Sequence, residues 1–108
     1  MADFKIDSRG FEMLISHTCT CAATDKIVVD RLSVGYMRRD EPVADNDSGW
    51  QFLWGFETEE YLDDLDNSAL YKLNTIANLD KAIIPYLDYP IGTQLERVEG
   101  SDEFIEVE

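Results

Sequence analysis

The sequence predicts an α+β fold: one small domain over residues 1–108, with a mixed, mainly antiparallel sheet and a helical segment near residues 68–88. The first observation is an alternation of aromatic residues typical of a strand, at Trp50, Phe52, Trp54 and Phe56. The second is the helical spacing of apolar residues after position 67. The third is the lack of repeats, low-complexity tracts and linkers, which favours a single unit.

The N-terminal part of the chain predicts several short strands. Weak alternation around residues 8–10 predicts a strand pair within the first fifteen residues, and residues 17–24 (HTCTCAAT) are a further strand candidate. Residues 26–30 (KIVVD) and 34–40 (VGYMRRD) are clearer strands, because they are rich in β-branched and aromatic side chains. The DRLS stretch between them predicts a hairpin.

A polar loop and an aromatic strand follow. Pro42 ends the preceding pair, and residues 41–49 (EPVADNDSG) consist mostly of turn-forming residues. The strand that begins at 50–54 (WQFLW) places its aromatic side chains on one face and Gln51 and Leu53 on the other. We expect most of this aromatic run to lie in the core, with a share for an interface left open. Gly55 interrupts the alternation, so we expect a bulge or a bend there.

The C-terminal part predicts the helical segment and the last strands. Asn67 or Ser68 can cap a helix between 68 and 79, whose apolar face is formed by Leu70, Leu73, Ile76 and Ala77.

Beyond this helix, Asp80 can cap a second short helical turn, whose length Pro85 limits. A turn at 88–92, a strand at 93–99 and an edge strand at 103–108 complete the predicted sheet.

Charge and targeting signals narrow the classes of function. The chain has 9 Lys and Arg residues against 23 Asp and Glu, a formal net charge of −14, which repels nucleic-acid phosphates. A negative charge of this size suits the binding of a cation, a basic peptide or a basic protein surface instead. The sequence shows neither a signal peptide nor an apolar run long enough to span a membrane, so we expect a cytoplasmic protein with free thiols.

His17, Cys19 and Cys21 form a candidate zinc site, since a strand would place their side chains on one face. Structural zinc usually needs four ligands, and the chain has no other His or Cys. The pattern therefore favours small buried thiols over a metal centre, and we expect no stoichiometric zinc and no cofactor.

The acidic run from residue 40 to residue 71 is the second candidate site, with ten carboxylates and no Lys or Arg. It lacks the spacing of a calcium-binding loop, which favours a solvated acidic surface. Beside an aromatic strand, such a surface is also a candidate for binding a partner. The residues assigned to this partner-binding surface are Trp54, Phe56, Glu59, Glu60, Tyr61, Asp63 and Asp64.

Signals for catalysis are weak. Neither a nucleophile elbow nor a glycine-rich phosphate loop occurs, and carboxylate pairs carry little information in a chain this acidic. We therefore predict that the chain is not an enzyme and has no catalytic residues.

Five stretches occur in an order that resembles one bacterial family: VGYMRRDEP (34–42), DSGWQFLWG (47–55), EEYLDD (59–64), LYKLNTIANLD (70–80) and IIPYLDYPIGTQLER (83–97). Over about residues 20–97 the chain resembles the domain of unknown function grouped as immunity protein 33 in polymorphic-toxin systems. The family pattern has a glycine in the turn after VVD, where Arg31 and Leu32 stand here. It has an acidic or small residue where residues 54–56 stand.

The resemblance implies a protein that binds and neutralises a bacterial toxin without catalysing a reaction. The acidic charge agrees with that role, because complementary fields speed the capture of a basic partner. The alternative is a small cytoplasmic regulatory domain that binds a cation or a metabolite.

Overall fold

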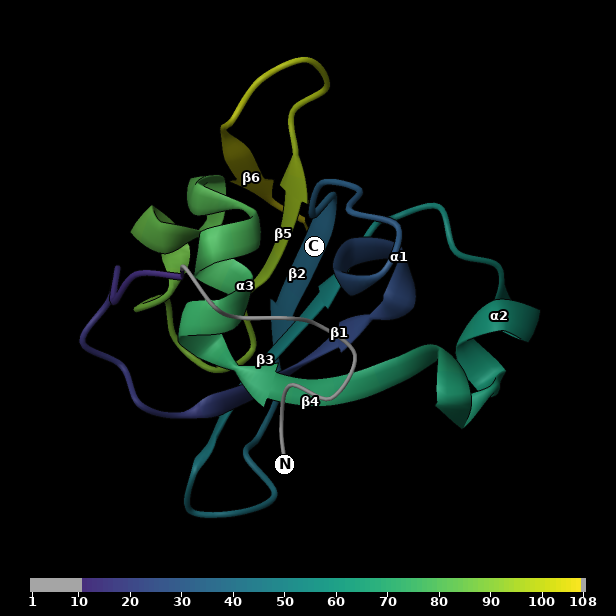
Figure 1. Cartoon of the computed structure of the whole chain (residues 1–108). Coiled ribbons are helices and arrows are strands. Elements are labelled where there is room, and N and C mark those ends of the chain that lie inside the picture. Colours follow the sequence, from purple (N-terminus) through teal and green to yellow (C-terminus); the bar gives the residue numbers. More distant parts are fainter. Residues whose placement is uncertain (1–10, 108) are drawn as a thin grey trace.

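A computed structural model describes residues 11–107, which contain one six-stranded sheet. The strands are β1 (Thr20–Thr24), β2 (Tyr36–Arg39), β3 (Asp47–Leu53), β4 (Ser68–Lys72), β5 (Gln94–Arg97) and β6 (Phe104–Glu106), in the spatial order β4-β1-β3-β2-β5-β6 (Figure 1). Only the β1–β3 pair is parallel among these strands, and the other neighbours pair antiparallel. The predicted α+β fold with a mixed, mainly antiparallel sheet is thus confirmed.

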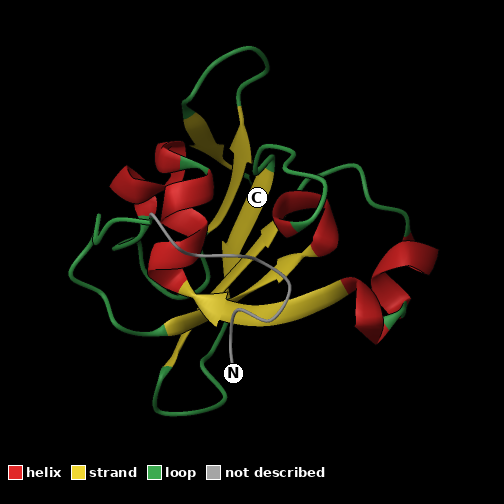
Figure 2. Ribbon diagram, viewed as in Figure 1, coloured by secondary structure: helices red, strands yellow, loops and turns green. Residues whose placement is uncertain are grey.

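The helices leave one face of the sheet uncovered. α1 (Asp25–Val28), α3 (Leu73–Leu79) and the 3-10 helix η2 (Lys81–Tyr86) lie over one face, whereas α2 (Glu59–Asp63) and the 3-10 helix η1 (Leu65–Asn67) lie beyond one end of β4 (Figures 1 and 2). The core therefore fills the space between the sheet and the first three helices; its largest buried side chains include Trp50, Tyr71, Phe52, Ile27, Met37 and Leu73. No helix in residues 11–107 is long and apolar enough to cross a membrane.

Several predicted strands are confirmed with shifted bounds. Predictions at 34–40, 50–54 and 93–99 correspond to β2, β3 and β5, and the stretch 17–24 contains β1. β3 begins three residues earlier than WQFLW, so it includes the end of the predicted polar loop. The predicted C-terminal edge strand is confirmed as β6, which lies at the edge of the sheet. The strand pair predicted within the first fifteen residues lies mostly outside the described part, and residues 11–15 form no strand.

The prediction of a strand and hairpin at KIVVD is wrong, because these residues contain the helix α1. β1 and β2 lie on opposite sides of β3, so the chain must cross a face of the sheet to pass from one to the other. The turn of helix makes that crossing and buries Ile27 and Val28 in the core. β-Branched residues favour strands only where a neighbouring strand is within reach.

The predicted start of the late helix at Asn67 or Ser68 is also wrong. Residues 68–72 form β4, which pairs with β1 along its whole length. Leu70 consequently lies on the strand and is 62% exposed, whereas Leu73, Ile76 and Ala77 occupy the buried face of α3 as predicted. Backbone pairing with β1 decided the conformation of a stretch whose side chains also suit a helix.

Asp80 caps the second helical turn, as predicted, and also joins it to two other parts of the fold. Its carboxylate accepts hydrogen bonds from the backbone N–H of Ala82 (3.1 Å) and of Val34 (2.9 Å). The guanidinium of Arg97 donates to both carboxylate oxygens, at 2.8 and 3.0 Å. Both side chains are largely buried, 12% exposed for Asp80 and 15% for Arg97. This cluster fixes the start of η2 to β5 and to the segment before β2.

Two asparagines of the LNTIAN stretch hold the N-terminal segment against α3. Asn74 and Asn78 are four residues apart, so their amides project from the same side of the helix. The amide oxygens accept from the backbone N–H groups of Leu14 (2.8 Å) and Glu12 (3.0 Å), and both amide nitrogens donate to the Glu12 carbonyl at 2.8 Å. These bonds supply partners for backbone groups that belong to no strand.

Arg31 has φ 59°, the left-handed conformation that favours glycine. It stands in the turn after α1. An L-residue with a β-carbon is strained there by about 1–2 kcal/mol.

We predict that Asp80→Ala lowers the free energy of unfolding by about 3 kcal/mol, because it removes both backbone caps and leaves a largely buried guanidinium unpaired. Denaturant unfolding measures the change. Asp88→Ala is the matched control, since the Asp88 side chain is 90% exposed, and it should change stability by less than about 0.5 kcal/mol. Equal effects of the two substitutions would contradict the role of Asp80.

We further predict that Arg31→Gly raises the free energy of unfolding by about 1 kcal/mol by relieving the left-handed strain. Thermal unfolding can compare it with Ser33→Gly, an exposed position in the same connection that does not have a positive φ. Ser33→Gly should have no effect or destabilise. A lower free energy of unfolding for Arg31→Gly would show that the arginine side chain stabilises the fold by more than the left-handed backbone strain destabilises it.

Candidate functional site

The aromatic run at residues 50–56 divides into a buried and an exposed half. Trp50 and Phe52 are 1% and 0% exposed, and the Trp50 indole N–H donates to the carbonyl of Leu87 at 3.0 Å. β3 ends at Leu53, and Gly55 then adopts φ 102°, which confirms the predicted bend. Beyond it Phe56 is 75% exposed. The bend therefore turns Phe56 away from the core that the first two aromatic residues fill.

The carboxylate of Glu57 holds this bend. It accepts hydrogen bonds from the backbone N–H groups of Trp54 (2.7 Å) and Gly55 (2.8 Å), and from the hydroxyl of Thr24 (2.7 Å) at the end of β1. The carbonyl of Trp54 also packs directly on Gly35, where a β-carbon would approach within 2.1 Å of that oxygen. The position of Phe56 is thus set by its neighbours on both sides of the bend.

Trp54 and Tyr61 form a half-buried cluster around Lys26 of α1. The Lys26 ammonium lies 5.6 Å from the centre of the Trp54 ring and 5.3 Å from that of the Tyr61 ring, within range of a cation–π interaction. Phe56 also contacts this cluster: its ring lies edge-on to the Trp54 ring at a centroid distance of 5.0 Å. The Trp54 ring therefore supports the Phe56 ring.

The pKa of Tyr61 is raised from its ordinary value, first by burial of the phenol and then by the carboxylates of Asp25, Asp30 and Glu57. Burial and neighbouring negative charge both disfavour a phenolate. Tyr61 therefore remains neutral over the physiological pH range and acts as a packing group in the cluster.

The acidic run contains a helix, α2, that the sequence did not reveal. The Thr58 hydroxyl caps it by accepting from the N–H of Tyr61 at 3.1 Å, and Glu59 and Glu60 in the first turn interact favourably with the helix dipole. No residue of α2 is buried. Its carboxylates therefore lie in solvent next to Phe56; they belong to Glu59, Glu60, Asp63 and, at the C-cap, Asp64.

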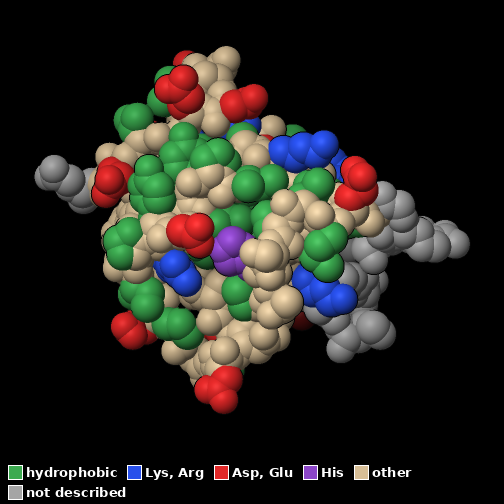
Figure 3. All heavy atoms as spheres, turned by 90° about the vertical axis from the view of Figure 1, so that its left-hand side faces the viewer, with side chains coloured by type: hydrophobic (Ala, Val, Ile, Leu, Met, Phe, Trp, Pro, Cys, Tyr) green, Lys and Arg blue, Asp and Glu red, His purple; other side chains and the backbone are tan. Residues whose placement is uncertain are grey.

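The predicted partner-binding residues thus come together at one corner of the molecule, which we call the acidic corner (residues 54–64). Within it Phe56 and the four carboxylates are exposed, whereas Trp54 and Tyr61 are partly buried. The opposite side of the molecule differs, because acidic side chains are scattered singly over it (Figure 3). Lys26 packs against the two partly buried rings of the acidic corner. Sequence reasoning missed this residue, because no local pattern links it to an aromatic pair about thirty residues away.

The candidate zinc ligands do not form a common site among the described residues. Cys21 is fully buried in the core, and Cys19 is partly buried against it. The His17 imidazole instead pairs with the carboxylate of Asp88 at 2.9 Å, on the side seen in Figure 3. Residues 11–107 contain no cluster of three or more potential metal ligands. The expectation that the protein binds no zinc stays a prediction.

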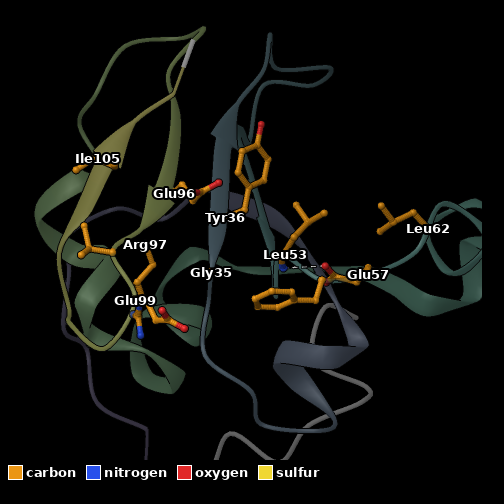
Figure 4. A pocket seen from close by; sticks show the side chains of 12 residues that line it. Gly35, Tyr36, Leu53, Glu57, Leu62, Glu96, Arg97, Glu99 and Ile105 are labelled. Carbon is orange, nitrogen blue, oxygen red and sulfur yellow. Dashed lines mark hydrogen bonds between the residues drawn. The ribbon is translucent and has the colours of Figure 1, made fainter.

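A hollow of about 680 Å³ adjoins the acidic corner on the uncovered face of the sheet (Figure 4). Glu57 and Leu62 lie on one side of it, and Ile105 of β6 lies on the other. Phe56 also belongs to its lining. Sequence reasoning missed this hollow, because its lining comes from segments up to seventy residues apart.

One comparison with known proteins gave a match. A family model described as the Immunity protein Imm33 domain matches residues 21–108. The match confirms the resemblance and extends it beyond residue 97 to the end of the chain. No curated protein and no solved structure matches.

We predict that Glu57→Ala loosens the bend, because three donors lose their acceptor. The free energy of unfolding should fall by about 2 kcal/mol, and the amide hydrogens of Trp54 and Gly55 should exchange faster. Glu59→Ala is the control and should leave both quantities nearly unchanged, since this side chain is exposed. Unchanged amide exchange in Glu57→Ala would show that the bend does not depend on the carboxylate.

Proposed function

This chain belongs to the Imm33 immunity-protein family, and we propose that it is a non-enzymatic, immunity-type inhibitor that binds a bacterial toxin in the cytoplasm. The observation that supports this proposal best is the acidic corner, in which an exposed aromatic side chain stands beside four exposed carboxylates. An inhibitor that acts by binding needs side chains that attract and hold its partner, and it needs no catalytic group.

Phe56 is the anchor in this proposal. Interface hot spots are aromatic side chains that lose solvent on binding, and Phe56 is 75% exposed yet supported by Glu57 and Trp54. A side chain whose backbone is already fixed loses little conformational entropy on binding. Trp54 and Tyr61 support this anchor, because their rings are partly buried around Lys26.

The exposed carboxylates of the acidic corner steer the encounter. With a net charge of −14, the chain attracts a basic protein over several ångströms, and complementary charge raises the association rate. Rapid capture suits an inhibitor that must reach a toxin before the toxin acts. Glu59, Glu60, Asp63 and Asp64 project from α2 and its C-cap beside the anchor, so an approaching basic surface meets them with Phe56.

The test begins with a search for a toxin gene beside the gene for this chain. We expect the chain to protect cells that express the toxin and to bind it in a stoichiometric complex. The four substitutions Glu59→Gln, Glu60→Gln, Asp63→Asn and Asp64→Asn together should slow association about tenfold at low salt and flatten its salt dependence. Dissociation should change much less. Stopped-flow mixing measures both rates.

The matched control carries four amide substitutions at exposed carboxylates outside the acidic corner, at Glu12, Asp88, Asp102 and Glu103. It has the same net charge as the first variant, so only the location of the charge differs. Equal slowing by both variants would show that net charge alone matters and would remove the proposed surface. Failure of the wild-type chain to bind or to protect would contradict the inhibitor function itself.

Phe56→Ala should change the dissociation rate constant instead of the association rate constant. We expect dissociation to accelerate about thirtyfold, equivalent to about 2 kcal/mol, because the anchor is lost while the steering charges remain. The fold should be retained, since Phe56 is mostly exposed. An unchanged dissociation rate in a folded Phe56→Ala protein would exclude Phe56 as the anchor.

A further inference from the structure

The hollow beside the acidic corner lies on the face of the sheet that no helix covers. Figure 4 shows Tyr36 and Leu53 between Leu62 on one side and Ile105 on the other. Tyr36 pairs with Leu53 on β3 and with Glu96 on β5, and Glu96 pairs with Ile105 on β6. These residues thus form one continuous row across four strands.

Exposed apolar side chains converge on this hollow. Ten large hydrophobic residues in the described part of the chain are exposed, and four of them line it: Phe56, Leu62, Val98 and Ile105. Single exposed apolar residues are normal on a protein surface, but a group of them around one depression indicates a binding site. The volume of about 680 Å³ lies within the range of ligand-binding pockets, which is about 300–1,000 Å³.

The charge around the hollow is negative. Glu96 and Glu99 lie in its lining and are exposed, and the carboxylate of Glu57 lies at its edge beside the bend. The one cationic side chain in the described lining is Arg97, whose guanidinium is held by Asp80. A ligand that enters the hollow therefore meets carboxylates without a competing cation.

Close backbone packing and a side-chain hydrogen bond hold part of the lining of the hollow in place. Gly35 and the backbone at Trp54 and Gly55 are in contact at its base, and a β-carbon on Gly35 would prevent this contact. The hydroxyl of Tyr36 donates to the side chain of Gln94 on β5 at 2.8 Å, which fixes the phenol ring across the strands. A preformed site requires little reorganisation when a partner enters.

We propose that this hollow receives a basic segment of the protein partner, one that carries one or two apolar side chains between lysines or arginines. The apolar side chains contact Leu53, Leu62 and Ile105, and the flanking cations face Glu96 and Glu99. The proposal rests on the inhibitor function and extends it, because Phe56 borders both the hollow and the acidic corner. The two surfaces then act as one interface.

The probe is a blocked hexapeptide, Lys-Lys-Leu-Phe-Lys-Lys, titrated into the isotope-labelled full chain. We expect saturable shifts of the methyl resonances of Leu53, Leu62, Val98 and Ile105. The Val43 methyls should not move, since Val43 is 92% exposed in the β2–β3 loop outside the lining. Binding of Lys-Lys-Ser-Ser-Lys-Lys and of Glu-Glu-Leu-Phe-Glu-Glu should be at least about tenfold weaker, because each lacks one of the two required features.

Two variants test the assignment within the chain. Leu62→Ser with Ile105→Ser removes apolar lining and should weaken binding of the lysine-flanked peptide about tenfold, whereas Val43→Ser should not change it. Glu96→Gln with Glu99→Gln should weaken it severalfold, and Glu12→Gln with Asp88→Asn is the control of equal charge. Equal affinity for all three peptides would overturn the proposal. So would equal effects of the lining and control variants.

Binding measurements with the toxin distinguish this proposal from the inhibitor function on which it rests. A toxin that binds wild type and the Leu62→Ser, Ile105→Ser variant with equal affinity would remove the hollow from the interface and leave the inhibitor function intact. A chain that binds the lysine-flanked peptide selectively, but neither binds the toxin nor protects against it, would contradict the inhibitor function. The hollow would then remain a binding site for basic, apolar segments. Weaker toxin binding by the lining variant, with Val43→Ser unaffected, would support both.

Discussion

The largely buried carboxylate of Asp80 is the point on which the arrangement of the layers depends. It caps η2, accepts the backbone N–H of Val34 before β2, and pairs with Arg97 on β5. One side chain thereby joins the helical layer to two neighbouring strands. Arg97 also lies in the lining of the hollow. Because its guanidinium is paired with Asp80, its positive charge does not oppose the carboxylates that a partner would meet there. The same contact that organises the fold leaves the hollow negative.

The acidic residues of this chain therefore have two different physical roles. Asp80 and Glu57 accept several hydrogen bonds each and hold backbone segments in place. The carboxylates of Glu59, Glu60 and Asp63 contribute little to the fold, because they project from α2, a helix in which no residue is buried. In the proposed function they attract a basic partner at a distance, an effect that salt screens and that requires no precise geometry. A net charge of −14 cannot by itself distinguish these two groups.

The sheet determines why the acidic corner and the hollow adjoin. Three helices cover one face of the sheet, so the residues that alternate with the core on β2, β3, β5 and β6 are left on the other face. The bend at Gly55 then places Phe56 at the margin of that open face, next to the start of α2. In the proposed function, these adjoining surfaces supply the steering charge, the aromatic anchor and the apolar depression.

The sequence by itself determined the fold class, the aromatic strand and the cap at Asp80, because each depends on side chains close together in the chain. It also located the acidic corner, whose residues lie within one stretch. Only the tertiary structure decided that KIVVD is helical and that Ser68 begins a strand, since sheet order and pairing with β1 overrode local propensity. Tertiary structure likewise decided the exposure of Phe56 and the hollow. Both depend on contacts between distant segments, such as Gly35 with Trp54, which local sequence patterns do not contain.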